Sequence, residues 1–230
     1  HIKQAGEMIN QAMQQVIIAG RGIIIAHGED ELLALVEKAQ IPVITTLLGK
    51  SALPDTHPLC LGMGGMHGEA YANRALQTAD LIVGIGTRFD DRLTSTASTF
   101  APAAKIIHID IDPAEIGKRV RVDLPIVGDA LNVLRQLVPL VQPATHAEWI
   151  ARIEEWRADT RARDILWRDT EELVPQYVIR QIWEATQGQA IMVSDVGQNQ
   201  MWEAQYYLHQ RRRGLITSGG LGTMGFAVPA

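Results

Sequence analysis

Short apolar runs alternate along the chain with longer stretches in which apolar residues recur at helical spacing. The apolar runs are Val16–Ala19, Pro42–Thr46, Leu81–Ile85, Lys105–Ile109 and Leu124–Val127. Stretches such as Glu29–Ala39 separate them. Runs as uniformly apolar as Leu81–Ile85 favour parallel strands that helices cover on both faces. The pattern predicts an α/β fold with a doubly wound, mainly parallel, Rossmann-like sheet.

The pattern changes near residue 142. A helical stretch, Leu131–Leu137, ends near Pro139, and the turn-rich segment Gln142–His146 follows. We therefore expect a domain boundary at this point. The expected parts are a first domain over residues 1–142, a linker with a charged, tryptophan-bearing helix over 143–170, and the start of a second α/β domain over 171–230.

The last part of the chain begins a second alternation. We expect a helix from about Pro175, a strand over Ala190–Ser194 and a helix over Gln200–Tyr207. The sequence starts with His1 rather than Met and ends on an apolar segment without a helix stop. Both ends therefore look cut.

Composition narrows the classes of function. The 230 residues are 47% hydrophobic and 20% charged, which is typical of a globular protein. The net charge of -5 lacks the basic excess of nucleic-acid binding, and the cluster Arg211–Arg213 stands alone. No apolar run reaches the roughly 20 residues that span a bilayer. The single cysteine, Cys60, fits a reducing compartment, so we expect a cytoplasmic protein without nucleic-acid or membrane partners.

Glycine-bearing or polar loops follow the predicted strands. The carboxyl ends of parallel strands meet at the edge of a sheet where doubly wound folds bind ligands, so one ligand could contact all of these loops. The segment Gly20–Gly22 lacks the third glycine of the dinucleotide fingerprint, so a tight turn without a ligand is an equal alternative. The loops are Gly20–Gly22, Thr45–Leu48, Gly86–Arg92, Asp110–Glu115 and Gly128–Ala130.

Two charged clusters lie in these loops. The segment Arg88–Arg92 contains two guanidinium groups and two carboxylates, which suit a pyrophosphate and a ribose. A solvated salt-bridge loop is the alternative. Asp110 follows a strand where an acidic residue commonly binds a ribose hydroxyl. A metal site at His108, Asp110 and Asp112 is a weak alternative, because strand alternation aligns them without supplying a ligand from another direction.

Three further segments combine glycine with methionine or amide side chains. In Gly62–Gly68 the backbone can approach a flat ligand while Met66 packs on it. His67 has no nucleophile in a triad setting nearby, so positioning is expected rather than catalysis. The segment Asp195–Met201 follows a strand and opens a helix, which suits a phosphate, and Ser218–Gly225 permits close approach of a large cofactor. Each is also compatible with a loop that binds no ligand.

Taken in order, four strings resemble the acetohydroxyacid synthase (acetolactate synthase) family of thiamine-diphosphate enzymes over essentially the whole chain. They are Gly65–Gly68, Gly86–Arg92, Val196–Trp202 and Ser218–Phe226. In that family the middle domain binds FAD, and the third domain holds thiamine diphosphate across a dimer interface. The resemblance implies decarboxylation of pyruvate on thiamine diphosphate. The hydroxyethyl unit is then added to pyruvate or 2-ketobutyrate, in branched-chain amino-acid biosynthesis.

The resemblance also implies which residues contact the cofactors. The implied FAD contacts are Gly20, Arg21, Gly22, Thr46, Leu47, Gly64, Gly65, Met66, His67, Gly68, Gly86, Thr87, Arg88, Asp90, Arg92, Asp110, Ile111, Glu115, Gly128, Asp129, Ala130, Gln200 and Met201. The implied thiamine diphosphate contacts are Val196, Gly197, Gln198, Asn199, Gly222 and Met224. Met224 is implied to hold the cofactor bent. Two positions depart from the family: Asn199 stands where His is usual, which puts a proton role in doubt, and Arg21 lies in a loop that is often all glycine.

The family's reactive groups are expected outside this sequence. The activating glutamate belongs to an N-terminal domain, and the Gly-Asp-Gly element that binds Mg²⁺ is expected after Ala230. We therefore assign no catalytic residue and no metal ligand, and we expect the isolated chain to lack synthase activity. The implied partners are 2-ketoacids, further copies of the subunit in a homodimer or tetramer, and a small regulatory subunit.

Three other interpretations stay open. A different flavin-containing thiamine-diphosphate enzyme, such as a pyruvate oxidase or a glyoxylate carboligase, shares the domains and differs in its product. A nicotinamide-dependent dehydrogenase fits the βαβ pattern, but the incomplete glycine fingerprint and the second glycine–methionine cluster argue against it. A non-catalytic flavin-binding scaffold is the third.

Overall fold

The computed structural model describes residues 1–165 and 171–230. It contains two units, each with its own sheet, and a six-stranded sheet forms the centre of the first. Every strand pair in this sheet is parallel, and the strand order is β3-β2-β1-β4-β5-β6. The predicted doubly wound sheet is confirmed. The strands are β1 (Gln15–Ala19), β2 (Val43–Thr45), β3 (Cys60–Met63), β4 (Leu81–Ile85), β5 (Lys105–Asp110) and β6 (Leu124–Val127).

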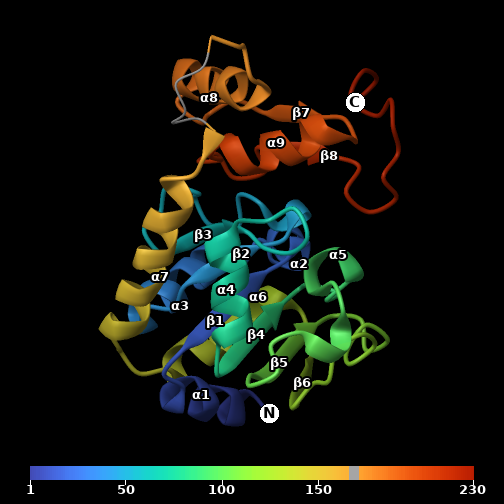
Figure 1. Cartoon of the computed structure of the whole chain (residues 1–230). Helices are drawn as coiled ribbons and strands as arrows, with labels where there is room; N and C mark the ends of the chain where they lie inside the picture. The colour runs from blue at the N-terminus through green and yellow to red at the C-terminus, as the bar shows by residue number, and fades with distance from the viewer. Residues whose placement is uncertain (166–170) are drawn as a thin grey trace.

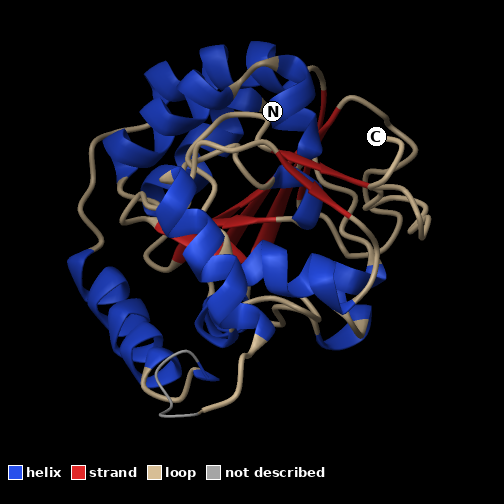
Figure 2. Cartoon of the chain, turned by 90° about the horizontal axis from the view of Figure 1, so that it is seen from above, coloured by secondary structure: helices blue, strands red, loops and turns tan. Residues whose placement is uncertain are grey.

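Helices cover both faces of this sheet, as Figure 2 shows. One face packs against α1 (Ile2–Gln11), α2 (Arg21–Ala26), α3 (Glu29–Ala39) and α6 (Ala130–Leu137). The other packs against α4 (Ala70–Thr78) and α7 (Ala147–Arg161). Shorter helices lie in the connections: η1 (Leu47–Gly49), α5 (Asp91–Thr94), η2 (Ala97–Thr99) and η3 (Val138–Leu140).

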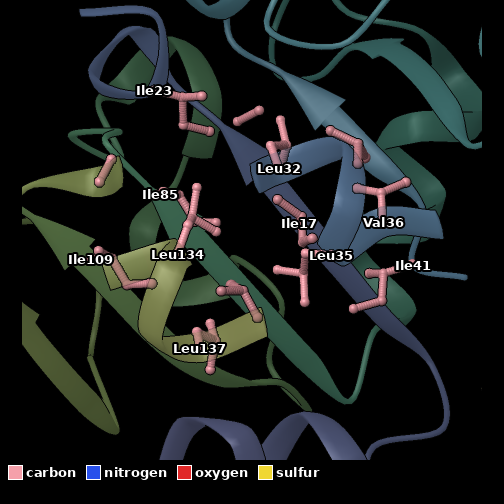
Figure 3. Close-up of a cluster of buried hydrophobic side chains, with 14 of the residues drawn as sticks. Ile17, Ile23, Leu32, Leu35, Val36, Ile41, Ile85, Ile109, Leu134 and Leu137 are labelled. Carbon is pink, nitrogen blue, oxygen red and sulfur yellow. The ribbon is translucent and has the colours of Figure 1, made fainter. Parts of the chain in front are cut away.

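Strand alternation divides the core between the two faces. Successive side chains of a strand point to opposite sides, so Ile17 joins one cluster while Ile18 joins the other. Figure 3 shows Ile17 and Ile85 of two neighbouring strands meeting Leu35 and Leu134 from helices. Both faces are covered, and this explains why β1 and β4 are buried at every position.

The second unit contains a two-stranded parallel sheet. Its strands are β7 (Met192–Ser194) and β8 (Leu215–Thr217), and its helices are α8 (Pro175–Thr186) and α9 (Gln198–Tyr206). The expected strand and both expected helices are present here. The end of the expected linker, residues 166–170 with Trp167, lies outside the described residues. Within the described part of the chain, no helix combines the length and apolarity needed to cross a membrane.

The second unit lies over the carboxyl edge, the edge of the six-stranded sheet at which its strands end (Figure 1). The backbone N–H of Asp55 donates to the His209 carbonyl at 2.9 Å, and the N–H of His209 donates to the Asp55 carboxylate at 2.8 Å. Arg212 pairs with Asp30, and Arg213 donates to the Ile24 carbonyl at 2.8 Å, so the cluster Arg211–Arg213 joins the two units.

Candidate cofactor site

The carboxyl edge contains the switch point of the sheet. The chain runs from β1 outward to β3 and then returns to place β4 on the other side of β1. The segments after β1 and β4, Gly20–Gly22 and Gly86–Arg92, therefore lead away from neighbouring strands in opposite directions. In doubly wound folds this is the place where a crevice for a nucleotide forms. The predicted loops are shorter in the structure, because α2 begins at Arg21 and α5 at Asp91.

Three glycines bring these two loops into direct backbone contact. Gly22 N–H donates to the Gly86 carbonyl at 3.0 Å. A Cβ added to Gly20 would lie 2.0 Å from the Gly86 oxygen, and one added to Gly22 would lie 2.6 Å from the Gly86 Cα. No side chain fits in that space. These glycines are thus required for packing between the loops, whether or not a ligand binds.

Backbone hydrogen bonds join the other predicted loops to this pair. The N–H of Thr46 donates to the Ala19 carbonyl at 3.0 Å, and the N–H of Gly86 donates to the Ile109 carbonyl at 2.8 Å. The N–H of Gly128 donates to the carbonyl of Asp110 at 2.9 Å. The five loops therefore lie along one edge, as expected. Contact of one ligand with all of them stays a prediction.

The charged loop after β4 has features of both predicted alternatives, a salt-bridge loop and a loop that binds a pyrophosphate. Phe89, at φ 50°, is buried and packs edge-on against His108, which anchors the loop. The Asp90 carboxylate accepts the N–H of Leu93 at 3.2 Å, capping α5, and pairs with Arg88 at 3.2 Å. The Arg88 and Arg92 side chains are nonetheless 56% and 69% exposed. Their guanidinium groups remain available to an anion at the edge of the sheet.

The ends of β5 and β6 present apolar side chains beside a carboxylate. Ile111 and Val127 are exposed, with 70% and 59% of their surface accessible. The Asp110 carboxylate accepts the N–H of Asp112 at 2.9 Å. Exposed apolar side chains next to an acidic residue suit a ring and a ribose hydroxyl.

His108 and its neighbours do not form a metal cluster. The His108 ring contacts the Thr87 carbonyl through Nε2 at 2.7 Å, and burial lowers the pKa of this side chain. Within the described residues, no group of three or more His, Cys, Asp or Glu side chains could hold a metal ion. His108, Asp110 and Asp112 are thus not brought together as a metal-binding group among the described residues.

The glycine–methionine loop begins two residues later than predicted, at Gly64, because Gly62 and Met63 belong to the end of β3. The N–H of Gly65 donates to Asn73 Oδ1 at 2.8 Å, and Asn73 Nδ2 donates back to the Gly65 carbonyl at 2.9 Å. A cavity of about 410 Å³ opens beside the exposed side chain of Met66. A separate cavity of about 420 Å³ lies at another place along the carboxyl edge. Sequence reasoning missed Asn73, which shows no signal of its own inside α4.

Several predicted site residues have local roles that the sequence did not separate from ligand binding. Thr46 caps η1, Asp129 caps α6, and Glu115 pairs with Lys118 at 2.7 Å. Gln200 is buried, and its Nε2 donates to Thr217 Oγ1 at 2.6 Å. Other predicted site residues differ in exposure. Thr87 and Ala130 are buried, Leu47 and Met201 are half-buried, and Arg21 and His67 are exposed. Gly64 and Gly68 pack against neighbouring atoms.

The two segments implied to bind thiamine diphosphate meet at the end of β7. Val196, Gly197, Gln198 and Asn199 follow this strand, and the segment with Gly222 and Met224 follows β8, its parallel neighbour. The N–H of Gly225 donates to the Asp195 carboxylate at 2.9 Å, which joins the segments. Met224 is exposed. Sequence reasoning gave Asp195 no separate role.

Comparison with known proteins identifies the family. The model of the thiamine pyrophosphate enzyme central domain matches residues 2–137, and that of the C-terminal TPP binding domain matches residues 195–230. The chain belongs to the thiamine pyrophosphate enzyme family. Both strand-end regions described above, at the six-stranded sheet and at β7, fall largely within these matches.

Individual thiamine pyrophosphate enzymes resemble the chain along its whole length. It is 45% identical to a protein of Methanocaldococcus jannaschii named probable acetolactate synthase large subunit, and spans 40% of it. It is 44% identical to the acetolactate synthase isozyme 3 large subunit of Escherichia coli, and spans 41% of that protein. It is 45% identical to the acetolactate synthase large subunit of Corynebacterium glutamicum, and spans 37% of it. The chain thus covers about two fifths of these relatives.

Proposed function

We propose that this chain is part of an acetolactate synthase catalytic subunit. The observation that carries the proposal is the 45% identity across the whole chain to a protein named as such a subunit. The parent enzyme would decarboxylate pyruvate on thiamine diphosphate and join the hydroxyethyl unit to pyruvate or 2-ketobutyrate. Its domains would be residues 1–142 for FAD, 143–170 as linker and 171–230 as the start of the thiamine diphosphate domain.

FAD would be held along the carboxyl edge of the six-stranded sheet. Three features of that edge support the assignment: the switch point between β1 and β4, the exposed guanidinium groups of Arg88 and Arg92, and the exposed apolar pair Ile111 and Val127 beside Asp110. The guanidinium groups would bind the pyrophosphate, and Asp110 a ribose hydroxyl. Glycine packing between the loops keeps this edge in one conformation.

Thiamine diphosphate would be held by the segments after β7 and β8. When bound, it supplies the electron sink for decarboxylation. The residues of this chain would bind and orient it: backbone groups of Val196–Asn199 at the start of α9, with Gly222 and Met224 opposite them. In keeping with the resemblance to acetolactate synthases, we propose that the Mg²⁺ ligands and the activating acid come from other parts of the subunit.

The partners follow from the same proposal. The substrates would be 2-ketoacids, and the subunit would assemble as a homodimer or tetramer in the cytoplasm. The word "large" in the relatives' names supports a small regulatory subunit as a further partner.

The reaction product tests this proposal. The full-length protein that contains the chain would be incubated with pyruvate, FAD, thiamine diphosphate and Mg²⁺, and the product identified by mass spectrometry. Acetolactate is the expected result. Acetyl phosphate would indicate a pyruvate oxidase, and tartronate semialdehyde from glyoxylate a carboligase; either outcome would overturn the proposal. The 230-residue chain alone is expected to form no acetolactate.

A substitution tests the flavin assignment separately. Arg88→Ala in the full-length protein should weaken FAD binding about tenfold, because a charge-assisted contact to the pyrophosphate is lost. Flavin fluorescence titration of the apoprotein measures this. The control is Arg121→Ala, an equally charged and 89% exposed arginine that precedes β6, at the opposite edge of the sheet. Equal affinities for the two variants would contradict the assignment.

A further inference from the structure

One residue contacts both segments that are proposed to bind thiamine diphosphate. Asp195, at the end of β7, accepts through Oδ1 the N–H of Val196 at 2.7 Å and the N–H of Gly225 at 2.9 Å. Its main-chain carbonyl accepts from Asn199 Nδ2 at 2.9 Å. The side chain therefore joins positions 30 residues apart, while the backbone of the same residue orients the side chain of Asn199.

The Asp195 carboxylate is held in its charged form. Partial desolvation opposes ionisation, but the N–H groups of Val196, Gly225, Ala227 and Phe226 outweigh it and lower the pKa of the carboxyl below its usual range. Hydrogen bonds from backbone N–H groups to a carboxylate are stronger than those to a neutral acceptor. The contact therefore persists across the neutral pH range.

The glycine segment beyond β8 contains residues in conformations that other residues rarely adopt. Gly222 and Gly225 have positive φ angles of 64° and 81°, which are accessible chiefly to glycine. Such a segment has many conformations to lose on ordering. The N–H of Thr223 donates to Ser218 Oγ at 3.0 Å within the segment, whereas the bond from Gly225 to Asp195 reaches the end of β7. The contact with Asp195 therefore restrains where the segment lies relative to β7.

We propose that Asp195 is a positioning residue for thiamine diphosphate. It fixes the segment that contains Gly222 and Met224 against the loop Val196–Asn199, and so sets the separation between the two halves of the cofactor site. This inference rests on the proposed function. Asp195 touches no reacting atom in this role, and its effect passes through the backbone of Gly225.

The test uses Asp195→Ala, Asp195→Asn and Asp195→Glu in the full-length protein. Asp195→Ala should raise the Kd and the KM for thiamine diphosphate about tenfold, because the charged acceptor is lost. FAD content and Tm should stay unchanged. Backbone amides of Gly225–Ala227 should exchange hydrogen faster, and Asp195→Asn, which keeps one acceptor, should restore part of the affinity. The fluorescence of Trp202, in α9, reports binding.

The matched control is Asp123→Asn. The Asp123 carboxylate also accepts a backbone N–H, that of Ile106 at 2.9 Å, but it lies just before β6, at the opposite edge of the sheet from these segments. An unchanged Kd and unchanged amide exchange in Asp195→Ala would overturn the inference, as would a parallel fall in FAD content and Tm. If the unaltered protein bound no thiamine diphosphate, the proposed function would be wrong, and the exchange of Gly225 would still decide whether Asp195 holds the segment.

Discussion

At the scale of single residues, the protonation of the Glu69 carboxyl changes near neutral pH. It follows the glycine–methionine loop, and burial raises the pKa of its carboxyl to about 7, although Lys50 opposes the shift. The folded chain thus binds this proton more tightly than the unfolded chain, whose carboxyl has the ordinary value of 4.5. The resulting stability is fully present below pH 4.5 and is lost as the pH rises through about 7.

The substitution Glu69→Gln should remove this pH dependence. The amide stays neutral, so the free energy of unfolding at pH 8 should rise by about 3 kcal/mol relative to the unaltered protein, with little change at pH 4.5. Urea denaturation at both pH values measures the difference. Glu155→Gln, on the exposed side of α7, is the control and should shift neither value. A gain of equal size at both pH values would contradict the assignment.

At the scale of elements, the uniformly apolar strands were predictable, whereas β3 and β8 were missed. Burial on both faces makes β4 apolar at every position, so its sequence alone predicts a strand. The strand β3 was missed because Gly62 interrupts it, and β8 because its short apolar run lies directly between the arginine cluster and the glycine segment. The helix α2 contains consecutive isoleucines, which favour strands, yet Ile23 and Ile24 are buried in the core as part of a helix.

Only part of the candidate site could likewise be predicted from the sequence. The glycine loops were located correctly because strand ends and glycines are visible in the sequence. The capping roles of Asp90 and Asp129 were not visible, because an oxygen that caps a helix has the same chemistry as one that binds a ligand. The contact of Gln205 with the His67 carbonyl, at 2.7 Å, joins residues 138 positions apart and has no local pattern.

Trp149 is one of the buried side chains that hold the helix α7 against the sheet. Trp149 is buried, and its Nε1 donates to the Gln15 carbonyl at 3.1 Å. Trp149→Ala should lower the free energy of unfolding by about 3–5 kcal/mol, since a large cavity forms. Trp149→Phe should lower it by about 1–2 kcal/mol, mainly by leaving that carbonyl without its donor. Chemical denaturation measures both losses. An unchanged stability in Trp149→Phe would show that the hydrogen bond contributes nothing, and equal losses in the two variants would contradict the expected cost of the cavity.

At the scale of the whole molecule, a buried polar group holds the second unit over the carboxyl edge. Lys50 and Asp55 pair at 2.9 Å with both side chains 2% exposed. Asp55 also exchanges two hydrogen bonds with the backbone of His209, whose ring contacts Glu203 at 2.6 Å. Removing one member of a buried pair leaves an uncompensated charge, which costs more than the pair itself contributes.

The substitution Asp55→Leu should therefore separate the units. Losing the carboxylate that pairs with buried Lys50 should cost about 3–5 kcal/mol. Limited proteolysis between the units should accelerate accordingly. Arg212→Ala, which breaks the exposed pair with Asp30 at the same junction, is the control and should cost at most about 1 kcal/mol. Similar proteolysis rates for both variants would refute a special role for the buried pair.

The helix α9 fixes the spacing between two loops that belong to different units. It begins beside Gly197, in the proposed thiamine diphosphate site, and Gln205 in its last turn donates to the His67 carbonyl in the proposed flavin site. A residue inserted inside the helix would rotate everything after it by about 100° and turn Gln205 away from that carbonyl. Natural variants of this protein should therefore carry neither insertions nor deletions inside α9, so the number of residues between the two contacts should be conserved.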